Sequence, residues 1–173
     1  MGFMTFLHGD DRFYNNIFVQ KWPVADVTTL RDSSEGTDSE NRLAGTWMFD
    51  EYPTYDEWIA QFDFTKPANM VQLERAHFGH LPVWVEGNMY LGGARSCKNE
   101  INNLIVPNDR NDIKIELVEK DGDYYLDTNI YDFMDDFTSR MINTDVLGKA
   151  FEPEQSFENT DGTPIQFDAD YFG

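Results

Sequence analysis

The stretch GDDRFYNNIFV, residues 9–19, combines a polar turn, two adjacent asparagines and an apolar run in a 173-residue chain. His8 to Arg12 is typical of a turn, and the aromatic residues after Arg12 predict a strand. Asn15 and Asn16 then predict a sharp corner, because asparagine tolerates the left-handed region and bonds to its own backbone. The stretch therefore predicts a bend between two short strands.

The same pattern recurs once further along the chain. Asn16-Ile17-Phe18-Val19 matches Asn88-Met89-Tyr90-Leu91 in residue type, and each follows an Asn or a Gly. Corner asparagines followed by short strands of large apolar residues are typical of stacked coils in a parallel β-helix. The interval between the two copies would hold about three coils of ~24 residues, or one coil with a long insertion. Two unrelated strands are the alternative.

Other segments carry local signals for mainly β structure. Residues 81–94 predict a strand pair bent at Gly87-Asn88, and residues 113–131 predict a β-hairpin around Lys120-Asp121-Gly122-Asp123. Residues 32–42 are expected to form an exposed loop, and residues 159–173 a turn followed by a short strand.

Residues 52–64 predict one short helix. Thr54 is a good N-cap, and Glu57, three residues on, completes a capping box. Three apolar residues then follow helical spacing: Trp58, Ile59 and Phe62.

The charge balance restricts the partners. Lys and Arg total 13 against 32 Asp and Glu, which gives a net charge of −19, and 15% of the residues are aromatic. Such a chain lacks the basic face that nucleic acid or an anionic membrane requires. An acidic, aromatic-rich surface suits a neutral partner such as a carbohydrate, and plain solubility is the alternative. No apolar run of about 18 residues could span a membrane.

The start of the chain, MGFMTFLHGDD, lacks the basic and apolar regions of a signal peptide. If the chain is a fragment, this says nothing about the compartment of its parent. The localisation is therefore unknown.

Two groups of residues could contact a ligand. Asp10, Asp11 and Arg12 place two acids and an arginine at the mouth of an apolar strand, where a turn network is the alternative to binding. Trp84 and Glu86 lie on one face of a predicted strand, and a carboxylate beside an indole is a familiar sugar-binding arrangement. An edge-strand charge beside a bend is the alternative for Glu86.

No metal or cofactor is expected. His77 and His80 are three residues apart, but Gly79 and Pro82 disfavour the helix on which that spacing would bind zinc. Phosphate-binding loops, paired-cysteine motifs and EF-hands are not found in the sequence. The single cysteine, Cys97, is expected to be buried or incidental.

Taken in order, these segments resemble the C-terminal part of right-handed parallel β-helix glycoside hydrolases, closest to the β-xylosidase type of family 120. The resemblance covers about residues 8 to 173, and its first and last blocks are the most specific. The blocks are GDDRFYNNIFV, YPTYDEW, LPVWVEGNMYLGGA, IKIELVEKDGDYYLD, VLGKA and ENTDGTPIQFDADYFG.

The resemblance implies a fold and an activity. Residues 1–106 would form the last β-helix coils, with an inserted loop and the short helix, and residues 107–173 a hairpin-rich extension packed on them. The implied activity is retaining hydrolysis of β-xylosides in xylo-oligosaccharides, in which one carboxylate attacks the anomeric carbon and a second acts as acid and base. A β-helix lyase or another glycosidase is the rival within enzymes.

The resemblance does not supply the catalytic pair. In such enzymes the nucleophilic Asp and the acid/base Glu lie in motifs upstream of the GDDRFYNN block, so no catalytic residue is assigned to this chain. We therefore expect a segment from the middle of a longer chain, inactive alone, whose partners are the missing N-terminal β-helix portion and a xylo-oligosaccharide. A non-catalytic carbohydrate-binding or structural β module is the alternative. The substrate surface is expected to include His8, Asp10, Asp11, Arg12, Trp58, Trp84 and Glu86.

Overall fold

The computed structural model describes residues 9–20, 43–63, 65–66, 79–107, 112–150 and 153–169. Strands dominate and the helices are short, as the all-β prediction requires. The strands are β1 (Arg12–Tyr14), β2 (Ile17–Val19), β3 (Trp84–Glu86), β4 (Met89–Leu91), β5 (Leu104–Ile105), β6 (Ile115–Lys120) and β7 (Asp123–Thr128). The helices are the 3-10 turns η2 (Trp47–Phe49) and η3 (Ile130–Phe133) and the α-helices α2 (Tyr55–Ile59) and α4 (Thr144–Leu147).

The chain divides into two compact units. Unit 1 draws its described residues from Met1–Tyr14, Phe49–Val85 and Arg140–Gly173, and unit 2 from Asn15–Met48 and Glu86–Ser139. Each unit therefore combines segments from distant parts of the sequence. The predicted division after residue 106 stays a prediction. None of the helices in the described residues has the length and apolar character needed to cross a membrane.

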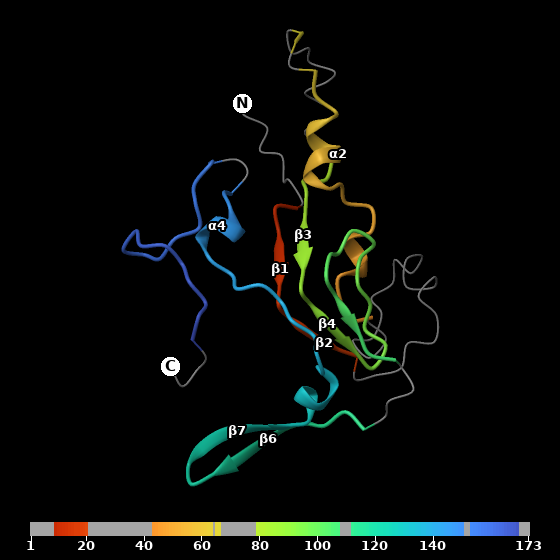
Figure 1. Ribbon diagram of the computed structural model, residues 1–173, viewed down its shortest axis with the longest axis vertical. Helices are drawn as coiled ribbons and strands as arrows, with labels where there is room; N and C mark the ends of the chain where they lie inside the picture. Colours follow the sequence, from red (N-terminus) through yellow and green to blue (C-terminus); the bar gives the residue numbers. More distant parts are fainter. Residues whose placement is uncertain are drawn as a thin grey trace, which may run out of the picture. The chain divides into compact units, whose positions relative to one another are not determined.

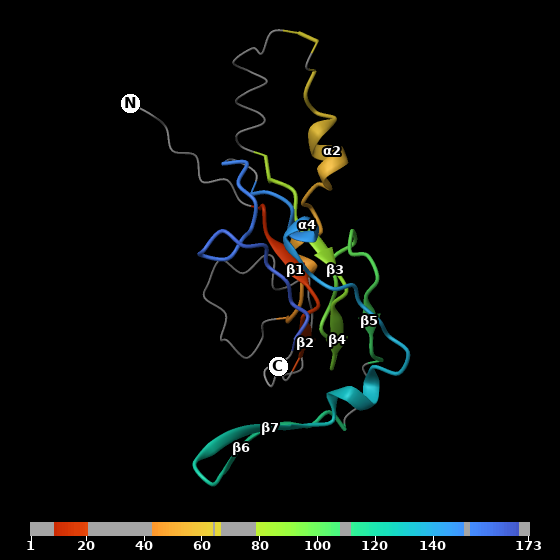
Figure 2. The ribbon, with the colours of Figure 1, turned by 60° about the vertical axis from the view of Figure 1, so that its left-hand side comes forward.

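Three parallel strands form the centre of unit 2. In the order β2-β4-β5, Ile17 is opposite Met89 and Met89 is opposite Leu104. The two segments matched in the sequence are therefore direct neighbours paired in parallel, although 72 residues separate them. Figure 2 shows the three strands side by side.

The third strand follows a corner that the sequence analysis did not single out. Asn15, Gly87 and Asn102 stand at equivalent positions and have φ angles of 56°, 73° and 53°, in the left-handed region that Asn and Gly tolerate. We call the three corner-plus-strand segments, residues 15–19, 87–91 and 102–106, the first, second and third rungs.

A ladder of polar side chains joins the first rung, the second rung and Glu100, which precedes the third rung. The backbone N–H and the Nδ2 group of Asn16 both donate to Asn88 Oδ1, at 2.8 and 2.9 Å. Asn88 Nδ2 donates to Glu100 Oε1 at 2.8 Å, and the hydroxyl of Tyr90 donates to Glu100 Oε2. Thr46 Oγ1 completes the network 2.8 Å from the Tyr90 hydroxyl. Asn88, Tyr90 and Thr46 are fully buried, so the hydrogen bonds offset the cost of removing polar groups from water.

Burial also determines the protonation state of the Tyr90 hydroxyl in the ladder. Burial and the bond to Glu100 raise the pKa of Tyr90 far above its ordinary value, so the phenol stays a neutral donor. Cys97 is buried nearby, and its backbone N–H donates to Thr46 Oγ1 at 3.0 Å. The expectation of a buried thiol is confirmed.

An apolar cluster covers the other side of the rungs. It contains the buried side chains of Met89, Leu91, Val106, Ile130 and Phe133. Because η3 supplies the last two of these, the chain that follows the hairpin returns to pack on the rungs.

The predicted hairpin forms as expected. Strands β6 and β7 pair antiparallel from Ile115↔Thr128 to Lys120↔Asp123 (Figure 1). The turn residues Asp121 and Gly122 have φ angles of 57° and 90°, as a two-residue primed turn requires.

The predicted helix also forms, with its capping box. Thr54 accepts a hydrogen bond from the Glu57 N–H, and the Glu57 carboxylate accepts from the Thr54 N–H at 2.8 Å. The Thr54 N–H, as the larger cause, and the Thr54 hydroxyl both donate to the Glu57 carboxylate and lower its pKa. A second short helix, α4, was not predicted, so the expectation of one short helix was wrong. Asn143 caps α4 by accepting the Val146 N–H at 2.9 Å, a signal already present in the sequence. The predicted loop at residues 32–42 lies outside the described residues.

The capping box gives a first testable prediction. Replacing Thr54 by alanine should destabilise unit 1 by about 1 kcal/mol, because the N-terminus of α2 loses its side-chain acceptor. In the same variant the pKa of Glu57 should rise part of the way toward its ordinary value, because the bond from the Thr54 hydroxyl is lost while the bond from the backbone N–H, the larger cause, remains. Thermal unfolding and an NMR titration of the glutamates measure the two effects. An unchanged Glu57 pKa would contradict the assignment.

Candidate functional site

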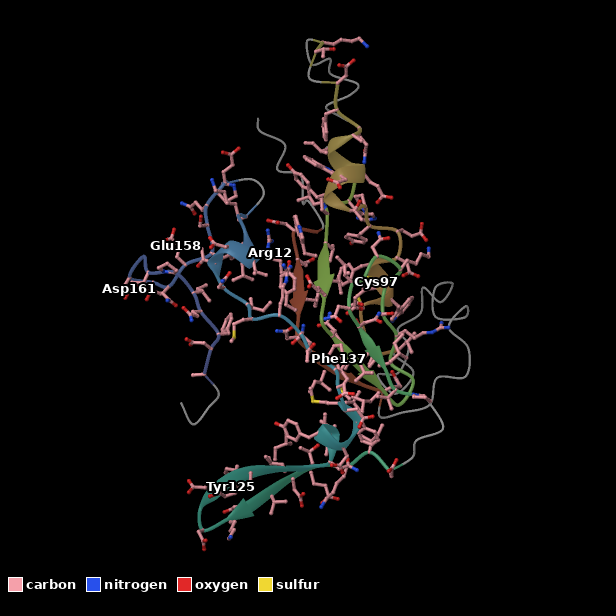
Figure 3. All side chains as sticks on the ribbon, viewed as in Figure 1. Arg12, Cys97, Tyr125, Phe137, Glu158 and Asp161 are labelled. Carbon is pink, nitrogen blue, oxygen red and sulfur yellow. The ribbon has the colours of Figure 1, made fainter. Side chains whose placement is uncertain are left out.

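The predicted acid–arginine group lies in unit 1, at the start of β1. Arg12 Nη1 donates to both the carbonyl oxygen and Oδ1 of Asp10, at 2.8 Å each. Nε donates to the carbonyl of Leu147 at 2.6 Å, and Nη2 to that of Lys149 at 2.7 Å. The guanidinium is therefore held by backbone and side-chain acceptors from two distant parts of the chain. Figure 3 shows Arg12 beside α4.

Two aromatic rings enclose the same guanidinium. Its central carbon lies 4.3 Å from the centre of the Trp84 ring and 4.5 Å from that of Phe157. The Arg12 side chain is 7% exposed. Cation–π contacts are strongest for such desolvated groups. This arrangement favours the turn-network interpretation of Arg12 over direct contact with a ligand, and it covers one face of the Trp84 indole.

Asp11 is exposed, whereas Asp10 and Arg12 on either side of it are partly buried. Its backbone carbonyl accepts the Trp84 N–H at 3.0 Å, while Asp10 donates its N–H to Pro82 at 2.8 Å. The bonded residues follow one another in the same chain direction on both segments, from Asp10 to Asp11 and from Pro82 to Trp84, as in a parallel strand pair. They fix the backbone on both sides of the Asp11 side chain.

Unit 1 also contains an aromatic cluster, and the charge of Asp11 acts on its tyrosine. The Tyr52 and His80 rings stack with centroids 4.1 Å apart and an interplanar angle of 15°. Phe49 meets Tyr52 edge-on at 5.1 Å and also contacts Phe13 at 5.0 Å. Burial, and the negative charge of Asp11, raise the pKa of Tyr52, so the carboxylate and the phenol are close enough to interact. We call Asp11, Tyr52 and His80 the acid–aromatic group.

The remaining predicted site residues have separate positions. Trp58 is buried at 8% exposure and packs on Phe62, with ring centroids 4.7 Å apart, which favours a core role. Glu86 is half-buried and alternates with buried Val85, so it shares a face of β3 with Trp84 as expected. His8 lies outside the described residues. The structure therefore brings Asp10, Arg12 and Trp84 together, with Asp11 next to them in the chain. Trp58 is not part of this group and is the buried residue of α2.

Sequence reasoning missed the pairing of Tyr52 with His80. The sequence analysis considered His80 only together with His77, and Tyr52 only within the predicted helix segment, and nothing in their spacing places one ring on the other. His77 lies outside the described residues. Within the described part of the chain, no group of three or more His, Cys, Asp or Glu side chains is arranged to hold a metal ion.

Comparison with known proteins gives one informative likeness. A solved structure of XylC in complex with xylose resembles 95% of this chain.

The two folds superpose with a TM-score of 0.70 at 25% sequence identity, and the match covers 22% of the XylC chain. This chain thus spans less than a quarter of the protein that it resembles. No protein-family model matches the chain, and no curated protein matches it either.

Proposed function

We propose that the chain is a carbohydrate-active segment of a parallel β-helix glycoside hydrolase of the β-xylosidase type, close to family 120. The observation that carries the proposal is the likeness of nearly the whole chain to part of XylC, which was solved with xylose. The three parallel rungs with left-handed corners support the β-helix part of the proposal. On this proposal the segment supplies late coils of the β-helix.

Two of the described acids, Asp10 and Glu100, already have structural partners. Retaining glycosidases need two carboxyl groups about 5 Å apart that face one bond. Asp10 is paired with Arg12, and Glu100 accepts bonds from Asn88 and Tyr90 in the ladder. We therefore propose that the catalytic pair is not supplied by this segment, and that the chain alone does not hydrolyse xylosides.

The acid–aromatic group is the proposed sugar contact. Aromatic rings stack on the apolar faces of pyranoses, and a carboxylate accepts hydrogen bonds from sugar hydroxyls. Asp11 is exposed and close to Tyr52, and His80 is also exposed. The high negative charge of the chain, −19, is compatible with a neutral ligand of this kind.

Binding of xylo-oligosaccharides to the full chain tests the proposal. We expect saturable NMR shift changes that weaken about tenfold in Asp11→Asn and in Tyr52→Leu, since each loses a contact worth about 1.4 kcal/mol. Tyr131→Leu is the matched control, because Tyr131 is an exposed tyrosine of unit 2. Aryl-β-xyloside should remain intact in the same samples.

The outcomes separate the proposal from its alternative. Binding without hydrolysis that depends on Asp11 and Tyr52 supports a sugar-contacting segment. If none of the three substitutions weakens binding, the sugar contact lies elsewhere in the chain. If no xylo-oligosaccharide binds, the carbohydrate proposal fails and a structural β module replaces it.

A further inference from the structure

Four rings of unit 1 form a continuous row, which we call the aromatic row. Phe13 of β1 contacts Phe49, with ring centroids 5.0 Å apart, and Phe49 meets Tyr52 edge-on at 5.1 Å. The Tyr52 ring then stacks on His80 at 4.1 Å, and the two ring planes are only 15° apart. Phe13, Phe49 and Tyr52 are partly buried, whereas His80 is exposed. The row therefore runs from strand β1 to the surface and ends in an imidazole.

The stack makes Tyr52 and His80 unequal as contacts for a ligand. A nearly parallel pair at this distance covers one face of each ring. Tyr52 also contacts Phe49 and is partly buried, while His80 is an exposed residue at the end of the row. In the described part of the chain, the ring face that the row directs toward solvent is thus the second face of His80, which we call the outer face.

The carboxylate of Asp11 lies near the same row. Asp11 and Phe13 are two residues apart in an extended segment, so their side chains point to the same side of it. Arg12 lies between them and contacts Trp84 and Phe157 instead. Burial, and after it the negative charge of Asp11, raise the pKa of Tyr52, which also indicates that the carboxylate is close to that ring.

The backbone holds His80 and the acid at neighbouring positions. Gly9 has a φ angle of 124°, and a Cβ atom there would overlap the carbonyl oxygen of Leu81, which directly follows His80. One residue further on, the Asp10 N–H donates to the Pro82 carbonyl at 2.8 Å. The segment that carries Asp11 is therefore packed directly against the segment that carries His80.

We propose that a pyranose ring of the ligand stacks on the outer face of His80, and that Tyr52 is a positioning residue that supports the imidazole from behind. This inference rests on the carbohydrate-binding function proposed above and names the stacking residue of that same site. The hydroxyl groups of β-xylopyranose are equatorial, so its faces present C–H groups to an aromatic ring. Its edge presents hydroxyl groups, which a carboxylate such as Asp11 accepts.

NMR titration of the full-length chain with xylotetraose tests the role of His80. His80→Ala should weaken binding about fivefold, because the stacking face is lost. His80→Phe should restore binding to within about twofold of the unmodified chain, since it retains a flat ring. Tyr55→Ala is the matched control and should bind like the unmodified chain, because Tyr55 is an exposed aromatic residue of unit 1 whose ring packs near Trp58.

Two substitutions of Tyr52 test the positioning role. Tyr52→Phe keeps the ring that supports His80 and loses only the hydroxyl, so its affinity should stay within about twofold of the unmodified chain. Tyr52→Leu removes the supporting ring and should weaken binding, as proposed above. If the hydroxyl of Tyr52 were itself the essential sugar contact, both variants would lose affinity.

Contacts between protons give the direct readout. Nuclear Overhauser effects should join the imidazole C–H protons of His80 to C–H protons of the bound sugar, and in His80→Phe they should come from the phenyl ring. The sugar protons over the ring should also shift upfield on binding. A purely structural role for His80 produces neither signal. Near-ultraviolet circular dichroism shows that each variant remains folded.

The outcomes separate this inference from the proposed function. Binding that depends on Asp11 but is unchanged in His80→Ala, a His80→Phe variant that binds no better than His80→Ala, or the absence of imidazole–sugar contacts would overturn the stacking role and leave the carbohydrate-binding function in place. If xylotetraose does not bind to the unmodified chain, both proposals fail together.

Discussion

Replacing Arg12 by methionine is expected to lower the free energy of unfolding of unit 1 by about 3 kcal/mol. Methionine retains an apolar stem, but it cannot donate to the carbonyls of Leu147 and Lys149 or to Asp10. These acceptors would be left in a partly buried site, where an unmade hydrogen bond costs more than a made one contributes. Denaturant unfolding followed by tryptophan fluorescence measures the effect, because Trp84 stacks on the guanidinium.

Two further variants isolate the cause. Arg140→Met removes an exposed guanidinium that lies 5.7 Å from the Tyr14 ring, and it should change stability by no more than about 0.5 kcal/mol. Arg12→Lys should remain strongly destabilised, because a lysine cannot donate in three directions from a planar fork. Wild-type stability in Arg12→Lys would show that charge, and not the fork geometry, is what unit 1 requires.

Replacing Asn88 by aspartate is expected to make the stability of unit 2 strongly dependent on pH. The substitution places a second carboxylate within hydrogen-bond distance of Glu100 in a buried ladder. Two like charges in one site raise the pKa of the pair in the folded chain. The folded state then binds more protons than the unfolded state, so stability falls as pH rises through these raised values. At neutral pH the loss should be about 3 kcal/mol.

The matched control is Asn103→Asp, at the same position of the third rung. Asn103 makes no bond to Glu100, so its substitution should leave the pH dependence close to that of the unmodified chain. Urea unfolding at a series of pH values compares the variants. Parallel pH profiles for Asn88→Asp and Asn103→Asp would show that the ladder does not couple Asn88 to Glu100.

Local signals explain what could be predicted from the sequence. The capping box of Thr54 and Glu57 and the turn at Asp121-Gly122 each involve residues a few positions apart, and both formed as expected. The match between Asn16 and Asn88 was a longer-range signal, and the structure pairs the two matched segments residue for residue.

The third rung was missed although its sequence is a close repeat of the first. NNLIV at residues 102–106 follows the same pattern as NNIFV at residues 15–19. The interval from the second rung to the third is much shorter than the interval from the first to the second, so a search for one fixed period does not find both. A search for the corner itself, Asn followed by large apolar residues, would have found all three rungs.

The surroundings of Arg12 could not be predicted. Its acceptors Leu147 and Lys149 lie 135 and 137 residues further along the chain, and neither carries a sequence signal because only their backbone carbonyls are used. The sequence likewise carries no signal for the stacking of His80 on Tyr52. Contacts made by backbone atoms or by packed rings depend on the completed fold, and composition and spacing do not specify them.

The unequal intervals between the rungs also determine the order in which they can form. Closing the 72-residue excursion between the first and second rungs costs about 1.4 kcal/mol more chain entropy than closing the short connection to the third. We therefore expect the second and third rungs to form first and the first rung to dock on them later.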